Sequence, residues 1–212
     1  IEQASKAIAL KPDEPRPYWL LARAQWSKPD KDLAKATDNA RKAVQLDPKN
    51  TDYLWTFAHL LFAQERYAQA VQELETLSKQ NQSFPMLFAL LGNAERLNKS
   101  FPQAYQYARK ASELSPQYAY PHWVIGQTYF DEKKFAEATA SAKQALQLFP
   151  DYGDAQRLFY TAAHRIEKDR EALQFLEELA AANPAAMSLR ESIGDVAHEY
   201  TKEFSKAYEA YR

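Results

Sequence analysis

The sequence lacks cysteine and has little glycine, and both shortages narrow the choice of fold. Without Cys the chain can form no disulfide, no thiolate nucleophile and no sulfur-ligated zinc site. Four glycines among 212 residues are too few for the tight hairpins of a β-sheet, whereas the abundant helix formers favour helices almost throughout. We therefore expect an all-α protein.

The sequence also lacks an excess of charge and a long apolar run. Its formal net charge is −1, so no basic field draws it to nucleic acid or to anionic lipid. No apolar run approaches the roughly 18–20 residues that cross a bilayer. We predict no nucleic-acid partner and no direct membrane insertion. The abundant Ala and Gln favour a bacterial source, and a cytoplasmic and a periplasmic location both stay open.

What the sequence does contain is a repeat of 34 residues. Prolines at 116, 150 and 184 share this spacing. A column of alanines shows the same period independently: its members are 34 residues apart except for the last two, which are 35 apart. They are Ala36, Ala70, Ala104, Ala138, Ala172 and Ala207. Two residue types that agree in period and phase predict a repeat architecture.

Each repeat is expected to form two helices. In segment 67–80, for example, Tyr67, Ala70, Leu74 and Leu77 share one helix face. Joints that contain proline, such as LDPKN, stop the helices because proline cannot extend them. In the last repeat we expect the first helix to run over 188–200.

The pattern resembles the tetratricopeptide repeat (TPR). Three residues before the alanine stands an aromatic residue in several repeats, and some first helices carry a Leu–Gly-like pair, as in Leu91–Gly92 and Ile125–Gly126. The resemblance implies a right-handed α-α superhelical solenoid of antiparallel helix pairs, with the first helices on the concave surface. The small residue allows the two helices of a repeat to approach to about 8–10 Å.

The resemblance covers the whole chain, which we expect to be a single TPR solenoid fragment over 1–212. Residues 29–31 are expected to lengthen one turn. Both ends of the chain fall inside a repeat, so we expect the parent protein to continue in both directions. The expected parts are a half repeat at 1–14, full repeats at 15–50, 51–84, 85–118, 119–152 and 153–186, and a truncated repeat at 187–212.

First-helix side chains that lie off the buried face are the candidate binding residues. Three of the first helices carry Trp, a polar residue and an aromatic residue at i, i+4 and i+7, and a basic cluster around residues 157–165 follows. The predicted peptide-binding groove consists of Trp19, Arg23, Trp55, His59, Phe62, Asn93, Arg96, Trp123, Gln127, Phe130, Arg157 and His164.

Such a surface suits an extended or helical peptide. Aromatic rings can cover its apolar side chains, and amide or guanidinium groups can hold its carbonyls or a carboxylate. The alternative is that the tryptophans only pack between neighbouring first helices. We favour the groove because Trp and Arg are common at binding hot spots and because the expected core is filled without them.

One known way in which TPR proteins bind peptides is not expected here. TPR proteins that hold the acidic C-terminus of a chaperone use Lys and Asn on three consecutive first helices. The matching positions of the first two repeats are Trp19, Arg23 and Thr56, so we predict no carboxylate clamp of this kind.

No catalytic, metal-binding or cofactor-binding residue is predicted. The four histidines fall in different repeats, and the sequence contains no HExxH, P-loop, GxSxG or GxGxxG motif. We therefore expect a protein that is not an enzyme.

The leading hypothesis is a scaffold that binds a peptide segment of a partner protein. The alternative is a regulatory or substrate-presenting arm of a larger enzyme or of a bacterial envelope export machine. A third hypothesis is end-to-end self-association through the truncated repeats.

Overall fold

The fold is described from a computed structural model, which covers residues 1–28 and 32–211. Every regular element in these residues is helical, which confirms the all-α class. None of these helices is long and apolar enough to cross a membrane. The lengthened turn predicted at 29–31 lies outside the described residues. Packing divides the chain into unit 1 (residues 1–103) and unit 2 (residues 104–212), and each unit is described by itself.

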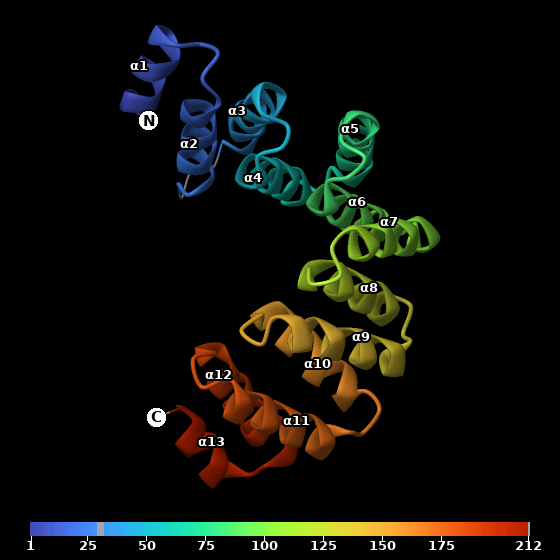
Figure 1. Cartoon of the computed structure of the whole chain (residues 1–212). Coiled ribbons are helices and arrows are strands. Elements are labelled where there is room, and N and C mark those ends of the chain that lie inside the picture. The colour runs from blue at the N-terminus through green and yellow to red at the C-terminus, as the bar shows by residue number, and fades with distance from the viewer. Residues whose placement is uncertain (29–31, 212) are drawn as a thin grey trace. The chain divides into compact units, whose positions relative to one another are not determined.

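Unit 1 contains a leading second helix, α1, and then alternating first and second helices (Figure 1). Its first helices α2, α4 and α6 contact one another in sequence order, and each contacts a second helix as well. The helices are α1 (Glu2–Leu10), α2 (Pro15–Trp26), α3 (Leu33–Leu46), α4 (Thr51–Phe62), α5 (Tyr67–Gln80) and α6 (Pro85–Leu97).

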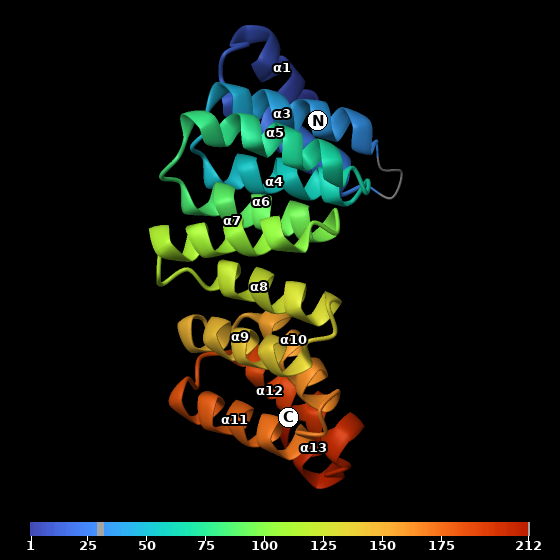
Figure 2. The same ribbon diagram turned by 90° about the vertical axis from the view of Figure 1, so that its right-hand side faces the viewer.

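Unit 2 repeats this arrangement. Its first helices α8, α10 and α12 contact one another in order, and in Figure 2 the second helices α9 and α11 are turned toward the viewer. The helices are α7 (Phe101–Leu114), which begins at the end of unit 1, α8 (Ala119–Asp131), α9 (Phe135–Leu148), α10 (Gly153–His164), α11 (Asp169–Ala182), α12 (Met187–Asp195), the π-helix η1 (Val196–Thr201) and α13 (Phe204–Tyr211).

The column of alanines lies where the two helices of each repeat meet. All six of these alanines, from Ala36 to Ala207, are at most 2% exposed. Gly126 has a similar place on α8, because a Cβ atom there would lie 2.9 Å from Cδ2 of Leu158 and 3.3 Å from the carbonyl oxygen of Ala138. Small side chains at these positions therefore permit the close helix packing that the repeat requires.

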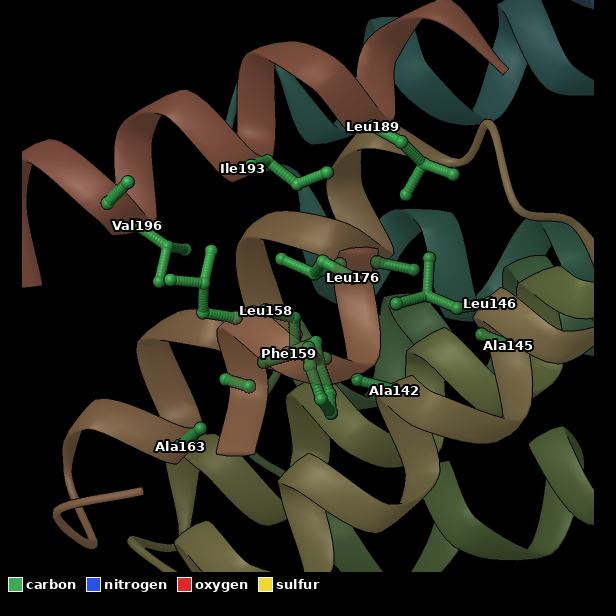
Figure 3. Packing of buried hydrophobic residues seen from close by; sticks show 14 of the residues in the cluster. Ala142, Ala145, Leu146, Leu158, Phe159, Ala163, Leu176, Leu189, Ile193 and Val196 are labelled. Atoms are coloured by element: carbon green, nitrogen blue, oxygen red, sulfur yellow. The ribbon is translucent and has the colours of Figure 1, made fainter. Parts of the chain in front are cut away.

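The core of unit 2 joins several repeats. Figure 3 shows Leu189, Ile193 and Val196 pointing from α12 and η1 toward Leu158 and Leu176, and all five belong to one buried cluster. Burial of such side chains contributes roughly 1.5–3 kcal/mol each. Stability in this unit therefore comes from contacts between neighbouring repeats.

A buried glutamine also connects first helices in unit 2. The side chain of Gln156 on α10 is fully buried. Its Nε2 atom donates to the carbonyl of Pro150 at 2.6 Å and to Oγ of Ser188 at 2.8 Å, and its Oε1 atom accepts from Oγ of Ser192 at 2.7 Å. The amide is thus satisfied on both sides, as a buried polar group must be.

A left-handed turn recurs after α4, α6, α8, α10 and η1. The N–H group after the turn residue bonds to a carbonyl five residues back, as Lys134 does to Tyr129 at 2.9 Å, which is a Schellman motif. An L-residue in this region costs about 1–2 kcal/mol. The φ angle lies between 56° and 65° at the five residues that occupy this place, Glu65, Lys99, Lys133, Glu167 and Lys202.

The last repeat departs from this pattern, because the helix predicted over 188–200 is present but its last part is a π-helix. The α-helix ends at Asp195, and residues 196–201 form the π-helix η1. After it, the N–H of Glu203 bonds to the carbonyl of Ala197, six residues back, at 2.7 Å. The alanine column has its interval of 35 in this repeat, and the wider π turn accommodates the additional residue.

The left-handed turn yields a stability prediction. We expect Lys133→Gly to raise the free energy of unfolding by about 0.5 kcal/mol, because glycine removes the Cβ clash but loses more entropy on folding. Lys133→Ala keeps the Cβ atom and should give no increase. Urea unfolding followed by circular dichroism measures both, and an equal gain for the two variants would contradict the explanation.

The close approach at Gly126 yields a second prediction. We expect Gly126→Val to lower the free energy of unfolding by about 2–3 kcal/mol, because the added atoms have no space between α8, α9 and α10. Gly153, whose added Cβ would meet nothing within 4 Å, provides the control, and Gly153→Val should cost less than about 1 kcal/mol. Comparable losses from the two substitutions would show that space at Gly126 is not limiting.

Candidate functional site

In unit 1, Trp19 connects two neighbouring first helices. Its indole Nε1 on α2 donates a hydrogen bond to Oγ1 of Thr56 on α4 at 2.9 Å, and its ring lies 5.7 Å from that of Tyr53. The guanidinium carbon of Arg23 lies 4.8 Å from the Trp19 ring centroid, a cation–π distance. Trp19 therefore packs between two neighbouring first helices, which is the structural role that the alternative interpretation gave to the tryptophans. One face of its ring also carries the guanidinium of Arg23.

The next predicted residues form a row along α4. The rings of Trp55 and His59 are 4.1 Å apart, and those of His59 and Phe62 are 5.4 Å apart. All three side chains are half-buried. The spacing i, i+4 and i+7 thus places His59 in contact with both Trp55 and Phe62 on one helix face.

On α6, the predicted pair Asn93 and Arg96 is joined by a hydrogen bond. Nε of Arg96 donates to Oδ1 of Asn93 at 3.0 Å. Asn93 is only 3% exposed, so its amide positions the guanidinium of Arg96 and offers little surface of its own. Arg96 is thus the more accessible member of the pair.

Unit 2 brings four of the predicted residues together. They line an open hollow of about 810 Å³, which we call the first-helix hollow. Its walls come from α8, α10, the turn after α10 and the π-helix η1. The lining residues are Gln127, Phe130, Arg157, Leu158, Thr161, His164, Arg165, Glu167 and Tyr200.

The rim of the first-helix hollow carries several charged groups, most of them paired. Arg157 forms an ion pair with Asp154, and Nδ1 of His164 lies 2.9 Å from a carboxylate oxygen of Asp169. The guanidinium carbon of Arg165 lies 5.7 Å from the ring centroid of Phe135. The exposed edges of the Arg157 and Arg165 guanidinium groups can still donate to a carbonyl or a carboxylate.

Tilted ring contacts hold the aromatic part of the hollow. The ring of Tyr200 lies 4.3 Å from His164 and 5.9 Å from Tyr160. Burial raises the pKa of Tyr160 to about 12, and it raises the pKa of Tyr200 as well. Both hydroxyl groups therefore stay protonated at neutral pH and can donate hydrogen bonds.

Trp123 and Phe130 are less independent of the core than the sequence indicated. Both pack against the buried cluster of unit 2, and Trp123 stacks on Tyr120 with ring centroids 5.3 Å apart. Phe130 contacts Phe135 edge-on at 5.2 Å. The two aromatics therefore contribute to packing, and only Phe130 also lines the first-helix hollow.

Tyr200 is one of the lining residues that the sequence pattern did not predict. A regular helix over 188–200 would have directed other side chains toward α10. The additional residue in the π turn rotates the rest of the helix by about 100° around its axis, and it places Tyr200 against His164. The interval of 35 between Ala172 and Ala207 was the available signal for this change.

Across the residues that the structure describes, no group of three His, Asp or Glu side chains could hold a metal ion.

Family models match two parts of the sequence. Tetratricopeptide-repeat models match residues 30–94 and residues 119–152. The chain is a tetratricopeptide-repeat protein. A search of curated proteins found no match.

Several solved structures, TPR proteins among them, share this fold at low sequence identity. A thermophilic TPR protein of Thermus thermophilus is 19% identical, with a TM-score of 0.63 over 86% of this chain and 98% of that one. YrrB, described as a TPR protein with an unusual peptide-binding site, is 21% identical, with a TM-score of 0.50 over 89% of this chain and 96% of that one. Yeast Tom70 is 16% identical, with a TM-score of 0.70 over 98% of this chain and 44% of its own.

The contacts of Trp19 yield a prediction about this TPR surface. We expect Trp19→Ala to lower the free energy of unfolding by about 2–3 kcal/mol, because it removes a half-buried ring and leaves Thr56 without its indole donor. Arg23→Ala should change it by less than about 0.5 kcal/mol. Urea unfolding measures both. A Trp19→Ala variant as stable as Arg23→Ala would mean that the tryptophan is surplus to packing.

Proposed function

We infer that this chain is a scaffold for protein–protein interaction, which is the role that the TPR fold suggests. We propose that this chain binds a peptide segment of a partner protein on the surface of its first helices, and that the first-helix hollow of unit 2 is a principal contact. The observation that carries the proposal is the convergence of Gln127, Phe130, Arg157 and His164 on one open hollow of about 810 Å³.

The chemistry of the first-helix hollow suits a peptide. The rings of Phe130 and Tyr200 provide surface for an apolar side chain, whereas Gln127 and Arg157 can bond to the peptide backbone. The volume falls within the range of about 300–1,000 Å³ that is usual for ligand sites. The similarity to YrrB, described as having a peptide-binding site, agrees with this class of ligand.

The proposed binding mode does not depend on a free C-terminal carboxylate. In unit 1 the guanidinium of Arg23 stacks on Trp19, and Thr56 accepts the Trp19 indole N–H. These groups are engaged with each other and do not form a set of Lys and Asn donors around a carboxylate. We therefore expect the peptide to bind along its length rather than by its terminus.

Selection from a displayed library of 12-residue peptides tests the proposal. Peptides selected on the wild-type protein should lose at least about tenfold in affinity for Thr161→Trp, because the indole occupies the hollow. Phe130→Ala should cost a similar factor by removing an apolar contact. Fluorescence anisotropy with the synthetic peptides measures both, and circular dichroism checks that the variants are folded.

A matched control adds a tryptophan elsewhere. Gln117→Trp, in an exposed turn before α8, should leave the affinity unchanged within about twofold. Amidation of the peptide C-terminus should also leave it unchanged. Peptides that bind Thr161→Trp and Phe130→Ala as well as wild type would overturn the site, and loss of binding on amidation would overturn the proposed mode.

A further inference from the structure

A second hollow of unit 2 lies on the opposite set of helices. It occupies about 260 Å³ between the second helices α9 and α11, with Phe159 of α10 at its base. We call it the second-helix hollow. Its walls are mostly apolar and include Ala140, Ile166 and Phe175, while Lys143 and Lys168 stand at its edge.

Unit 1 contains a hollow at the same place in the repeat. It lies between α3 and α5 over Phe57, has a volume of about 590 Å³ and is lined by Arg41 and Glu73 among others. Three repeats separate the two sites in sequence, so Phe57 corresponds to Phe159 and Arg41 corresponds to Lys143. The chain thus presents two versions of one site.

In the hollow of unit 1, two carboxylates of the same chain neutralise the cation Arg41. The guanidinium of Arg41 donates to both carboxylate oxygens of Glu73, with distances of 3.0–3.2 Å, and it bonds to Asp38 at 2.7 Å. The hydrogen bonds with Glu73, the largest cause, raise the pKa of Arg41. Its guanidinium carbon also lies 5.5 Å from the Phe57 ring centroid.

In the hollow of unit 2 the cation is Lys143, and neither of the two carboxylates is present. Ala140 stands in the place of Asp38, and Phe175 stands in the place of Glu73. Nζ of Lys143 lies 4.5 Å from the Phe175 ring centroid, and the Phe175 ring lies 4.9 Å from that of Phe159. Lys143 makes no ion pair with any residue that the structure describes.

The other charges at this edge do not neutralise Lys143. Nζ of Lys168 pairs with Glu171 at 3.0 Å, which leaves Lys143 as the uncompensated charge of the second-helix hollow. The hollow is smaller than the roughly 300–1,000 Å³ of sites for small molecules. One apolar side chain suits this space better than a whole small ligand.

We propose that the second-helix hollow of unit 2 is a second binding site, for an acidic peptide segment of a partner protein. One large apolar side chain of the segment enters between α9 and α11, and an adjacent Asp or Glu pairs with Lys143 where Glu73 pairs with Arg41 in unit 1. The site is separate from the first-helix hollow, and it does not depend on the function proposed for that surface.

Display selection with subtraction tests this inference. A library of 12-residue peptides is selected on the wild-type chain and depleted on Ala140→Trp, whose indole would fill the second-helix hollow from an exposed position. The peptides that survive should combine a Leu, Ile, Met or Phe residue with an Asp or Glu within three positions. These peptides should keep their affinity for Thr161→Trp, which blocks only the first-helix hollow.

Charge variants then test the role of Lys143. Lys143→Glu should weaken the selected peptides by about fivefold or more, since it replaces an attraction at the rim by a repulsion. Ala140→Asp gives Lys143 the internal carboxylate that Arg41 has in Asp38, and it should weaken them about threefold. Lys49→Glu makes the same change in net charge at an exposed turn of unit 1 and should have no effect.

Several results would overturn the inference. One is that no peptide distinguishes the wild-type chain from Ala140→Trp. Another is that the distinguishing peptides are basic or lack an apolar residue, and a third is that Lys143→Glu binds them as well as Lys49→Glu does. Loss of binding to Thr161→Trp would assign these peptides to the first-helix hollow, and it would leave the function proposed there intact.

Discussion

The close approach of the two helices within each repeat is the constraint on which the rest of this structure depends. It requires a small residue at the crossing, and the alanines from Ala36 to Ala207 provide it because each is almost completely buried. In a repeat protein each unit packs mainly on its neighbours. The helix separation in one repeat therefore determines where the next repeat can pack, and with it the spacing of the surface hollows.

A left-handed turn after α4, α6, α8, α10 and η1 returns the chain toward the second helix of the repeat. It is built from charged residues such as Glu65 and Lys133 rather than glycine, so the fold carries a small conformational cost in each of these repeats. The hydrogen bonds of the Schellman motif offset that cost. In the last repeat the same turn comes after a π-helix, because one additional residue has to be accommodated before the helix can end.

Because the backbone repeats regularly, equivalent positions in different repeats can carry side chains with different contacts. Arg41 and Lys143 occupy the same place in the repeat, but only the first has carboxylates of its own chain around it. Likewise Trp19 on α2 is bonded to the neighbouring first helix, while Phe130 and Arg157 line an open hollow. Differences between repeats, more than the repeat itself, therefore indicate where partners bind.

The sequence by itself determined the period, the two-helix unit and the buried alanine column, because these depend on spacing along a single helix and on side-chain size. It also located Gln127, Phe130, Arg157 and His164 on one surface. Only the tertiary structure decided that Trp123 packs against the core, that Tyr200 faces His164, and that Lys143 lies against the ring of Phe175 at the edge of a hollow. Those outcomes depend on contacts between residues distant in sequence and on one additional residue in a helix, neither of which a repeating pattern can specify.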